Sequence, residues 1–526
     1  MSLKGILAAS AALLALVNAC RPASEEIVDL GKDYRAEGLH APWSGCDNGT
    51  SFRSHAASGR FFFTFEAEDG TPACAAEFKG ERDVDPDDRV EIFFSPTKDL
   101  SQPYYCAEID REGRVMDYKA ESYRFFDFGW NFLTMKTFAS QSDGLYRVGG
   151  SVSLEELRSL GLDLEGGFWV GVFQGDAASY GAEVTWYSLV PTADVEPDFH
   201  KEGAFFPCRI TQMQHRKGVV VYAGDITTLG TQAWEQRIDA AHLDFIALHA
   251  ATSNDRADSL ERFVRSDAGR DFLAMCQRKG VGVEYEMHAL DWLLPRSLFD
   301  EHPEYFRMDS TGVRVADYNM CFSNPEAVEA MRPQLEKALK WMKPTTHRYF
   351  LWGDDKQWKY CYCEHCRELS PSEQTLLHEN AILAMLREYD PEAMLAHLAY
   401  HQTLPAPQKV APADGVFLEF APILRDYAFP LGDEQLQALK ENLLVFPAAT
   451  QHILEYWLDE SMNARWKRTE RPALSIDGSH IERDILLYRS LGACSLTTFA
   501  TWLDGPYQTL NGSALPLFES YATAFE

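Results

Sequence analysis

Two adjacent carboxylates, Asp354 and Asp355, follow the apolar run 349–352 after a single residue, Gly353. Side chains of a strand alternate between its faces, so both carboxylates can approach one ligand only where the backbone bends, and glycine permits that bend. Like charges held close raise the pKa of one carboxyl group, which keeps that group protonated as a general acid. A helix N-cap with a solvated neighbour is the structural alternative. We expect Asp354 and Asp355 to be catalytic.

Carboxylates, histidines and aromatic residues also follow other short apolar runs. This is the residue composition of glycoside hydrolysis, in which carboxylates protonate a leaving oxygen and aromatic faces carry a sugar ring. These positions contain no serine nucleophile elbow and no glycine-rich phosphate loop. A role in core packing is the alternative for the histidine and the aromatic residues. The residues predicted to bind substrate are Asp225, Glu286, His288, Trp292, Glu419, Glu455, Tyr456, Trp457 and Trp502.

A cysteine cluster follows the acid pair. Cys361, Cys363 and Cys366 are an odd number of thiols and cannot pair wholly among themselves, and Cys321 on the preceding segment is the natural fourth member. A tetrahedral zinc site is one solution, and disulfides are the other in an oxidising compartment. Either way we expect a structural role and no cofactor for catalysis.

The elements that must position these residues alternate between strand and helix after Pro207. Such alternation over about 320 residues is typical of a (β/α)8 TIM barrel, whose active site lies at the C-terminal ends of its strands. The candidate residues would therefore meet at one mouth. The eight predicted strands are 218–225, 244–252, 281–288, 348–355, 394–400, 416–423, 452–458 and 495–502, with a helix at 326–342 before the fourth.

Before Pro207 the chain consists of short aromatic runs bounded by turn residues. Their period-2 patterns favour an antiparallel β-sandwich. Residues 110–113 carry a hairpin signal, and Ser153 with the next four residues indicates a short capped helix. We predict a multidomain protein, with a β-sandwich over 36–207 and an α/β barrel over 208–526. The runs are 60–66, 89–94, 104–109, 114–118, 167–173 and 183–190.

The first residues have the pattern of an export signal. A lysine and an apolar run precede Leu-Val-Asn-Ala-Cys20, which resembles a bacterial lipobox. This predicts a signal peptide over 1–19, lipidation of Cys20, a tether over 20–35, and an outer-membrane lipoprotein facing the cell surface or the periplasm. An ordinary secretory signal is the alternative. A membrane anchor is disfavoured because the run is shorter than the roughly 20 residues that a span needs.

The charge balance excludes one class of partner. Acidic residues outnumber basic ones 79 to 49 in the 526-residue chain, and the formal net charge is −30. The counterion release that drives nucleic-acid binding is therefore missing, and we expect no nucleic-acid partner. We expect a monomer whose partner is a glycan substrate.

The N-terminal half carries motifs of a known sandwich. DDRVEIFFSP, YYCAEIDREGRVMDYKA and SVSLEELRSLGL are similar to the family 9-like carbohydrate-binding sandwich, over roughly residues 24–200. These motifs are mostly structural, so the resemblance implies the fold more than retained sugar binding. Trp130, Trp169 and Trp186 are candidates for a stacking platform, with burial in the sandwich core as the alternative.

The barrel half carries a second set of motifs. EHPEYF at 301–306, GVR at 312–314, NMCFSNP at 319–325, the acid pair and the cysteine cluster resemble the family 163 glycoside hydrolases, first catalogued as the domain DUF4838. The resemblance implies endo-type cleavage beside β-linked N-acetylglucosamine (GlcNAc) in complex N-glycans. Members of that family carry a small α/β domain before the barrel, where this chain has the predicted sandwich.

The acid pair itself resembles that of the substrate-assisted N-acetylhexosaminidases, in which the 2-acetamido oxygen of the sugar is the nucleophile. Mapped by order, Asp354 would orient the acetamide and Asp355 would be the acid/base. Two other functions stay open. One is an α-glucuronidase-like glycosidase with carboxylates on two separate strands, and the other is a non-catalytic surface protein that binds glycans.

Overall fold

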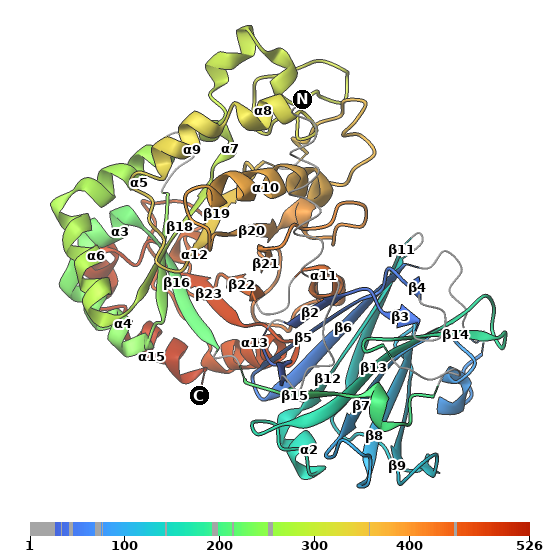
Figure 1. Ribbon diagram of the computed structural model, residues 1–526. Coiled ribbons are helices and arrows are strands. Elements are labelled where there is room, and N and C mark those ends of the chain that lie inside the picture. Colours follow the sequence, from blue (N-terminus) through green and yellow to red (C-terminus); the bar gives the residue numbers. More distant parts are fainter. Residues whose placement is uncertain are drawn as a thin grey trace, which may run out of the picture.

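The computed structural model describes residues 27–32, 34–41, 46–68, 75, 77–142, 145–191, 198–212, 215–250, 256–356, 358–446 and 450–525. The predicted signal peptide and Cys20 lie outside the described residues. The chain forms an N-terminal sandwich of two sheets and a closed barrel of eight parallel strands with helices around it, which confirms the predicted fold class (Figure 1). Within these ranges no helix has the length and apolarity to cross a membrane.

The sandwich has one larger and one smaller sheet. The larger has the strand order β10-β9-β8-β7-β13-β14-β3-β4, and β15 pairs with β1 and β13 beside it; the smaller has the order β11-β12-β6-β5-β2. The strands are β1 (Val28–Asp29), β2 (Tyr34–Glu37), β3 (His40–Ala41), β4 (Cys46–Asp47), β5 (Ser51–Ala57), β6 (Arg60–Glu68), β7 (Arg89–Ser95), β8 (Tyr104–Asp110), β9 (Val115–Ala120), β10 (Phe126–Asp127), β11 (Lys136–Ser142), β12 (Leu145–Ser153), β13 (Phe168–Ala177), β14 (Val184–Ser188) and β15 (Phe206–Arg209).

The short helix and the hairpin turn that the sequence predicts in this half are both present. Helix α2 (Leu154–Ser159) begins at Ser153, whose hydroxyl accepts the N–H of Glu156 at 3.0 Å. The turn between β8 and β9 closes with the N–H of Gly113 donating to the carbonyl of Asp110 at 2.9 Å, and Gly113 has φ +81°.

The three tryptophans do not form one platform. Trp130 packs at the core between the sheets, with its ring 4.8 Å from that of Phe132. Trp186 and Trp169 instead border a separate apolar cluster, where Trp186 meets Phe199 edge-on at 5.4 Å. Trp169 lies on β13 and Trp186 on β14, whereas Trp130 lies in the segment between β10 and β11.

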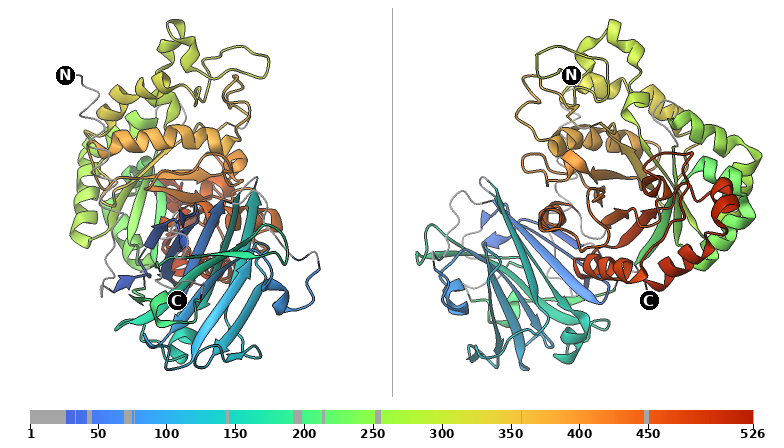
Figure 2. Two further views of the ribbon diagram at one scale, coloured as in Figure 1. Left: turned by 45° about the vertical axis from the view of Figure 1, so that its right-hand side comes forward. Right: turned by 180° about the vertical axis from the view of Figure 1, so that it is seen from behind.

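The smaller sheet of the sandwich packs against the barrel. Phe61, Phe63 and Phe65 of β6 face the core between the sheets, whereas Phe62 faces outward and packs with Cys494 before the last barrel strand. The Nε2 atom of His55 lies 3.3 Å from the carbonyl oxygen of Gly492 in the same contact. Figure 2 shows the sandwich against one side of the barrel in both views.

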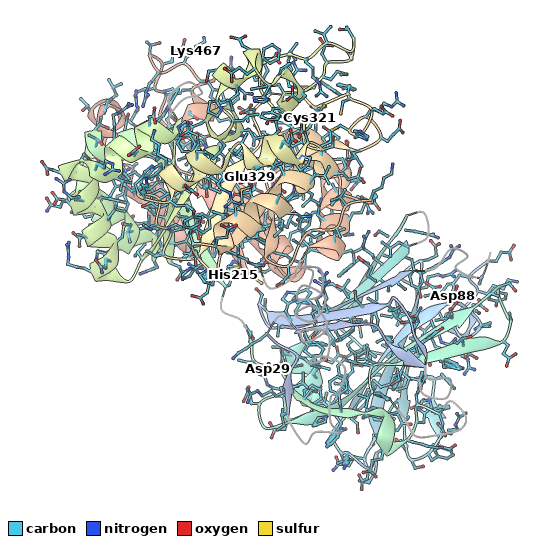
Figure 3. The ribbon with its side chains drawn as sticks, turned by 45° about the horizontal axis from the view of Figure 1, so that its top comes forward. Asp29, Asp88, His215, Cys321, Glu329 and Lys467 are labelled. Carbon is cyan, nitrogen blue, oxygen red and sulfur yellow. The ribbon has the colours of Figure 1, made fainter. Side chains whose placement is uncertain are left out.

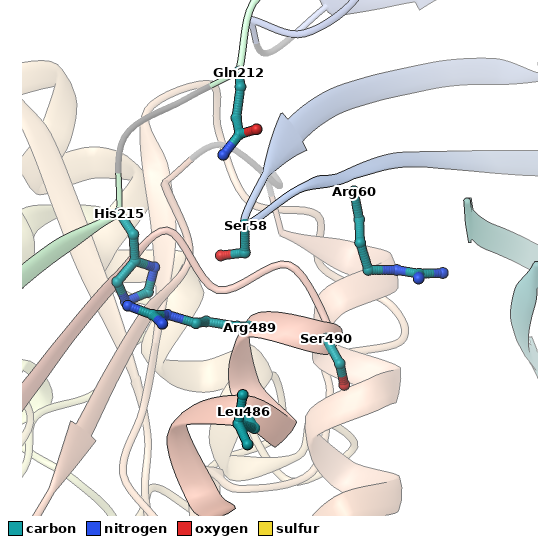
Figure 4. Close-up of a pocket in the computed structure, with 7 residues that line it drawn as sticks. All are labelled: Ser58, Arg60, Gln212, His215, Leu486, Arg489 and Ser490. Carbon is teal, nitrogen blue, oxygen red and sulfur yellow. The ribbon is translucent and has the colours of Figure 1, made fainter. Parts of the chain in front are cut away.

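A cleft of about 690 Å³ lies at this junction, between the β5–β6 hairpin and helix α13 (Gly478–Ser490). Ser58 at the hairpin tip lies on one side of it, and His215, just before the first barrel strand, lies on another (Figure 4). The cleft is therefore at the N-terminal end of the barrel strands, opposite the end where the site of a barrel enzyme lies.

Each of the eight predicted runs overlaps one barrel strand. Seven of the strands end one to three residues earlier than predicted, and β18 ends at the predicted residue. Asp225 therefore lies on helix α3, and the acid pair lies in the loop after β19. The strands are β16 (Arg216–Tyr222), β17 (Phe245–His249), β18 (Gly282–His288), β19 (Arg348–Trp352), β20 (Met394–Ala399), β21 (Val416–Phe420), β22 (His452–Glu455) and β23 (Ser495–Phe499).

The helices cover the outside of this barrel (Figure 1). The predicted helix 326–342 is divided in two, and Pro333, which lacks a backbone N–H, falls in the first turn of the second helix. In addition to α13, the helices are α3 (Ala223–Leu229), α4 (Thr231–Ala241), α5 (Arg256–Arg265), α6 (Asp267–Lys279), α7 (Leu290–Leu293), α8 (Pro325–Glu329), α9 (Arg332–Ala338), α10 (Pro371–Arg387), α11 (Asp433–Val445), α12 (Glu460–Asn463), α14 (Gly505–Asn511) and α15 (Leu515–Thr523).

Candidate functional site

A layer of rings closes the barrel interior at the C-terminal ends of its strands. We call this layer the aromatic floor, and it consists of Tyr222, His249, His288, Trp352, Tyr456 and Phe499. Trp352 lies near its centre, with ring centroids 5.5 Å from His249 and 5.1 Å from His288. Tyr456 stacks on Phe499 at 5.1 Å on the other side. The rings meet because each is the last inward-facing side chain at its strand end.

A small pocket opens beside this floor, at the ends of β19 and β20. Its walls include both aspartates, His288, Tyr400 and His401. The Nδ1–H of His288 donates to the carbonyl oxygen of Gly353 at 2.6 Å, which ties the floor to the start of the acid-pair loop. The structure thus brings together three residues predicted to act at the site: His288, Asp354 and Asp355.

Asp354 is the buried member of the pair, with 9% of its surface exposed. Its Oδ2 lies 3.3 Å from Nη2 of Arg296, and its Oδ1 accepts the backbone N–H of Asp291 at 3.3 Å. Its own backbone N–H donates to the side-chain oxygen of Asn319 at 2.9 Å. An adjacent guanidinium and a backbone donor both favour the ionised carboxylate.

Asp355 is the exposed member. Its Oδ1 accepts the hydroxyl of Tyr400 at 3.4 Å. Burial, and then the charge of Asp355, raise the pKa of Tyr400 well above its ordinary value, so the phenol keeps its proton and acts as a donor. The two neighbouring aspartates therefore face one pocket in different environments. Asp354 is buried and ion-paired, whereas Asp355 is exposed.

Glu286 and Glu419 lie inside the barrel below the floor, and neither side chain is exposed. Trp352 donates its indole N–H to Oε2 of Glu419 at 2.7 Å and covers it. Burial raises the pKa of both carboxyl groups, and the charge of Glu419 raises that of Glu286 further. Both were predicted to bind substrate, but the floor separates them from the pocket.

Three predicted binding residues at the end of strand β22 and directly after it point to different sides of the chain. Tyr456 points inward and joins the floor, whereas Glu455 and Trp457 point toward the helices. Glu455 pairs with Arg425 at 2.9 Å, and the indole N–H of Trp457 donates to Asp484 of α13 at 3.3 Å. The alternation of side chains along an extended chain explains why the structure does not bring Glu455 and Trp457 to the pocket.

The remaining predicted residues lie at the rim. Asp225 is wholly buried on α3, and its Oδ2 accepts the backbone N–H of Trp502 at 2.8 Å. The ring of Trp502 lies 5.2 Å below the guanidinium of Arg468. Trp292 on α7 is half-buried against the helix layer of the barrel. None of these three side chains lines the described pocket.

The buried carboxyl of Asp225 should make stability depend on pH. Burial raises its pKa to about 7. Between the ordinary value near 4 and this value the folded state binds more protons than the unfolded state, so stability falls as pH rises through that window. Asp225→Asn keeps an oxygen that accepts from Trp502 and carries no charge. We expect the free energy of unfolding of the variant minus that of wild type, both measured in urea, to be about 2–3 kcal/mol larger at pH 8 than at pH 5.

The exposed Asp433 at the start of α11 provides the matched control. Asp433→Asn should leave the difference from wild type equal at the two pH values. If Asp225→Asn also gives the same difference at both, the carboxyl does not titrate in this window.

Two residues that hold Asp354 were not among the predicted site residues. Arg296 and Asn319 lie in the long segment between β18 and α8, outside the predicted strand ends. Arg314 lies in the same segment, and its Nη1 donates to the carbonyl of Phe306 at 2.6 Å and to the sulfur of Cys361 at 3.8 Å.

Two groups of side chains have the composition of metal ligands among the described residues. Cys321, Cys361, Cys363 and Cys366 converge with their sulfur atoms within 4.8 Å of one another. Glu286, Glu419 and His452 form the second group, inside the barrel. Burial lowers the pKa of His452 well below its ordinary value, so this ring is neutral.

Residues 233–488 match a known domain family. This is DUF4838, a domain of unknown function. The DUF4838 match runs from α4 to α13 and includes the acid pair, the residues that hold Asp354 and the four clustered cysteines. The first and last barrel strands fall outside it. No curated protein matches the sequence.

Solved structures similar to the chain align at low TM-scores. A family 9 carbohydrate-binding module from Caldicellulosiruptor kristjanssonii in complex with glucose has a TM-score of 0.25 and 12% identity, covering 36% of this chain and 95% of its own. The catalytic domain of a Thermobifida fusca endoglucanase has a TM-score of 0.32 and 12% identity, and the alignment covers 55% of this chain and 79% of that domain. A Bacteroides ovatus GH5 xyloglucanase in complex with a heptasaccharide has a TM-score of 0.31 and 10% identity, and the alignment covers 80% of this chain and 95% of that enzyme. At these TM-scores the alignments carry no conclusion about activity.

Proposed function

We propose that this protein is a glycoside hydrolase that cleaves β-linked GlcNAc by substrate-assisted, retaining catalysis. The observation that carries the proposal is the different setting of two adjacent carboxylates on one pocket at the mouth of a (β/α)8 barrel. Arg296 holds Asp354 as an ion pair at 3.3 Å, whereas Asp355 is exposed beside the phenol of Tyr400.

The two settings suit two different tasks. An ionised, clamped Asp354 accepts the N–H of the 2-acetamido group and stabilises the positive charge that develops when the acetamide oxygen attacks the anomeric carbon. Asp355 gives its proton to the glycosidic oxygen as that bond breaks, and then takes a proton from the water that opens the oxazoline. No carboxylate of the protein becomes bonded to the sugar.

The placement of the other acids weighs against an inverting mechanism with carboxylates on two strands. Inverting pairs stand roughly 6.5–9.5 Å apart on either side of the substrate. Other strands send Glu284, Glu286 and Glu419 into the barrel, but all three are fully buried and none of them lines the pocket. The adjacent aspartates line it directly.

Product analysis on a defined substrate panel tests this function. We expect hydrolysis of aryl β-GlcNAc and of GlcNAc-containing glycans, no hydrolysis of glucuronides, retention of the anomeric configuration by NMR, and inhibition by GlcNAc-thiazoline, which imitates the oxazoline. Inversion would contradict the acetamide mechanism. Binding of the glycans without turnover would instead favour a non-catalytic glycan-binding protein.

The native substrate follows from the resemblance over residues 280–370, and we propose endo-type cleavage of complex N-glycans. Mass spectrometry of a treated glycoprotein should then show one GlcNAc left on each asparagine. We further propose a monomeric outer-membrane lipoprotein anchored through Cys20. Cys20→Ser should abolish incorporation of labelled fatty acid in cells.

A further inference from the structure

Four cysteine side chains converge from two loops that follow neighbouring barrel strands. Cys321 lies between β18 and α8, and Cys361, Cys363 and Cys366 lie between β19 and α10. Their exposed fractions are between 0% and 5%, and their sulfur atoms lie within 4.8 Å of one another. Figure 3 labels Cys321 in the barrel half of the molecule, away from the sandwich.

The spacing of the sulfur atoms is that of a metal site. The Sγ atoms of Cys321 and Cys363 are 3.7 Å apart. A disulfide brings two sulfur atoms to about 2.05 Å. Four thiolates about 2.3 Å from one zinc ion, at the corners of a tetrahedron, lie about 3.8 Å apart.

Hydrogen-bond donors point at the sulfur atoms, as they do in metal-thiolate sites. The backbone N–H of Met308 donates to Sγ of Cys361 at 3.4 Å, and Nη1 of Arg314 donates to the same atom at 3.8 Å. The arginine supplies a positive charge where four thiolates and a divalent ion would leave two net negative charges.

The backbone of the loop that carries Cys361, Cys363 and Cys366 is also fixed by hydrogen bonds to Gln374. The side-chain oxygen of Gln374 accepts the N–H of Cys361 at 3.0 Å, and its amide nitrogen donates to the carbonyl oxygens of Cys361 and Cys366, each at 3.1 Å. The sulfur atoms therefore meet through a fixed backbone rather than through flexible side chains.

We propose that Cys321, Cys361, Cys363 and Cys366 bind one zinc ion in a closed structural site that joins the two loops. A second consequence rests on the proposed function. Asn319, two residues before Cys321, accepts the N–H of Asp354 at 2.9 Å and donates to the carbonyl of Lys359 at 3.0 Å. The ion would thus fix the loop that positions Asp354. Four protein ligands leave no open position, so the metal has no catalytic task.

Metal analysis of the full-length protein tests the site. We expect one zinc ion per chain after dialysis, and cobalt substitution should give the thiolate charge-transfer and d–d absorption bands of a tetrahedral sulfur site. Cys363→Ser should lose the metal. Cys276→Ser should keep it, because that buried cysteine lies on α6, outside the cluster. A wild-type chain without metal overturns the proposal, whether peptide mass spectrometry finds the cluster as thiols or as disulfides.

A measurement on the wild-type chain covers the case in which Cys363→Ser does not fold. A thiol-reactive mercurial should release one equivalent of zinc, detected with a metallochromic dye, and no release would contradict the site. Hydrogen exchange should then quicken at residues 306–321 and at the amide of Asp354, while sandwich peptides stay unchanged. Unchanged exchange at Asp354 would overturn the positioning consequence alone. Neither zinc release nor hydrogen exchange depends on hydrolysis. A failure of the zinc site can therefore be distinguished from a failure of the proposed function.

Discussion

Asp355→Asn is expected to lower kcat on glycan substrates by about 10²–10⁴-fold, because it removes the proton donor for the glycosidic oxygen. Aryl β-GlcNAc substrates with good leaving groups need little protonation, so they should retain much more of the wild-type rate. The exposed position of Asp355 makes a folding defect a poor explanation for such a loss. Steady-state kinetics on a series of leaving groups measures the difference.

Asp354→Asn should show the complementary pattern. Arg296 and the N–H of Asp291 hold this carboxylate in place, and its charge is needed to orient the acetamide. Its loss should slow formation of the oxazoline by a similar factor for every leaving group, because the nucleophile itself is misplaced. The leaving-group dependence of the two variants therefore separates their roles.

Asp433→Asn, on the exposed first turn of α11, serves as the control and should have wild-type kinetics. If the bend after Gly353 exchanges the two roles, the two phenotypes would be exchanged and the mechanism would stand. Wild-type turnover in both aspartate variants would remove the pair from the chemistry.

Arg348→Met is expected to have the largest effect on stability. Arg348 of β19 lies inside the barrel, where its Nε and Nη2 bind the two oxygens of Glu284 at 2.7 and 3.0 Å and its Nη1 binds Ser495 at 2.9 Å. Removal of one partner leaves a buried charge without compensation, which costs about 3–5 kcal/mol. Urea denaturation should show a loss of that size in the free energy of unfolding.

Two variants test the cause of that loss. Arg348→Met combined with Glu284→Gln removes both charges and should recover part of it, since a buried pair replaced at both ends is far less costly than a broken one. Arg332→Met removes exposed ion pairs with Glu388 and Glu329 and should lower the free energy of unfolding much less than Arg348→Met does. Equal losses in the single and double Arg348 variants would assign the effect to packing instead of charge.

The sequence alone was enough to predict the barrel and the place of the acid pair in it. Short apolar runs bounded by glycine and polar residues are local features, and a strand forms wherever such a run meets neighbours of the same kind. Eight of them alternating with helices permit few arrangements. Asp354 and Asp355 lie at the end of the fourth predicted run, so their location at the strand ends required no knowledge of distant contacts. The members of the cysteine cluster were equally local in the sequence, apart from Cys321.

The tertiary structure decided which of the predicted residues reach the pocket. Glu455, Tyr456 and Trp457 are adjacent in the sequence, but a shift of one residue along an extended chain turns a side chain to the opposite face, and the pattern did not say which faces inward. Trp352, which comes from another strand, covers Glu419 inside the barrel. Arg296 and Asn319 reach Asp354 from a long loop without periodicity. These contacts join residues 35 to 67 positions apart, and only the closed barrel brings such residues together.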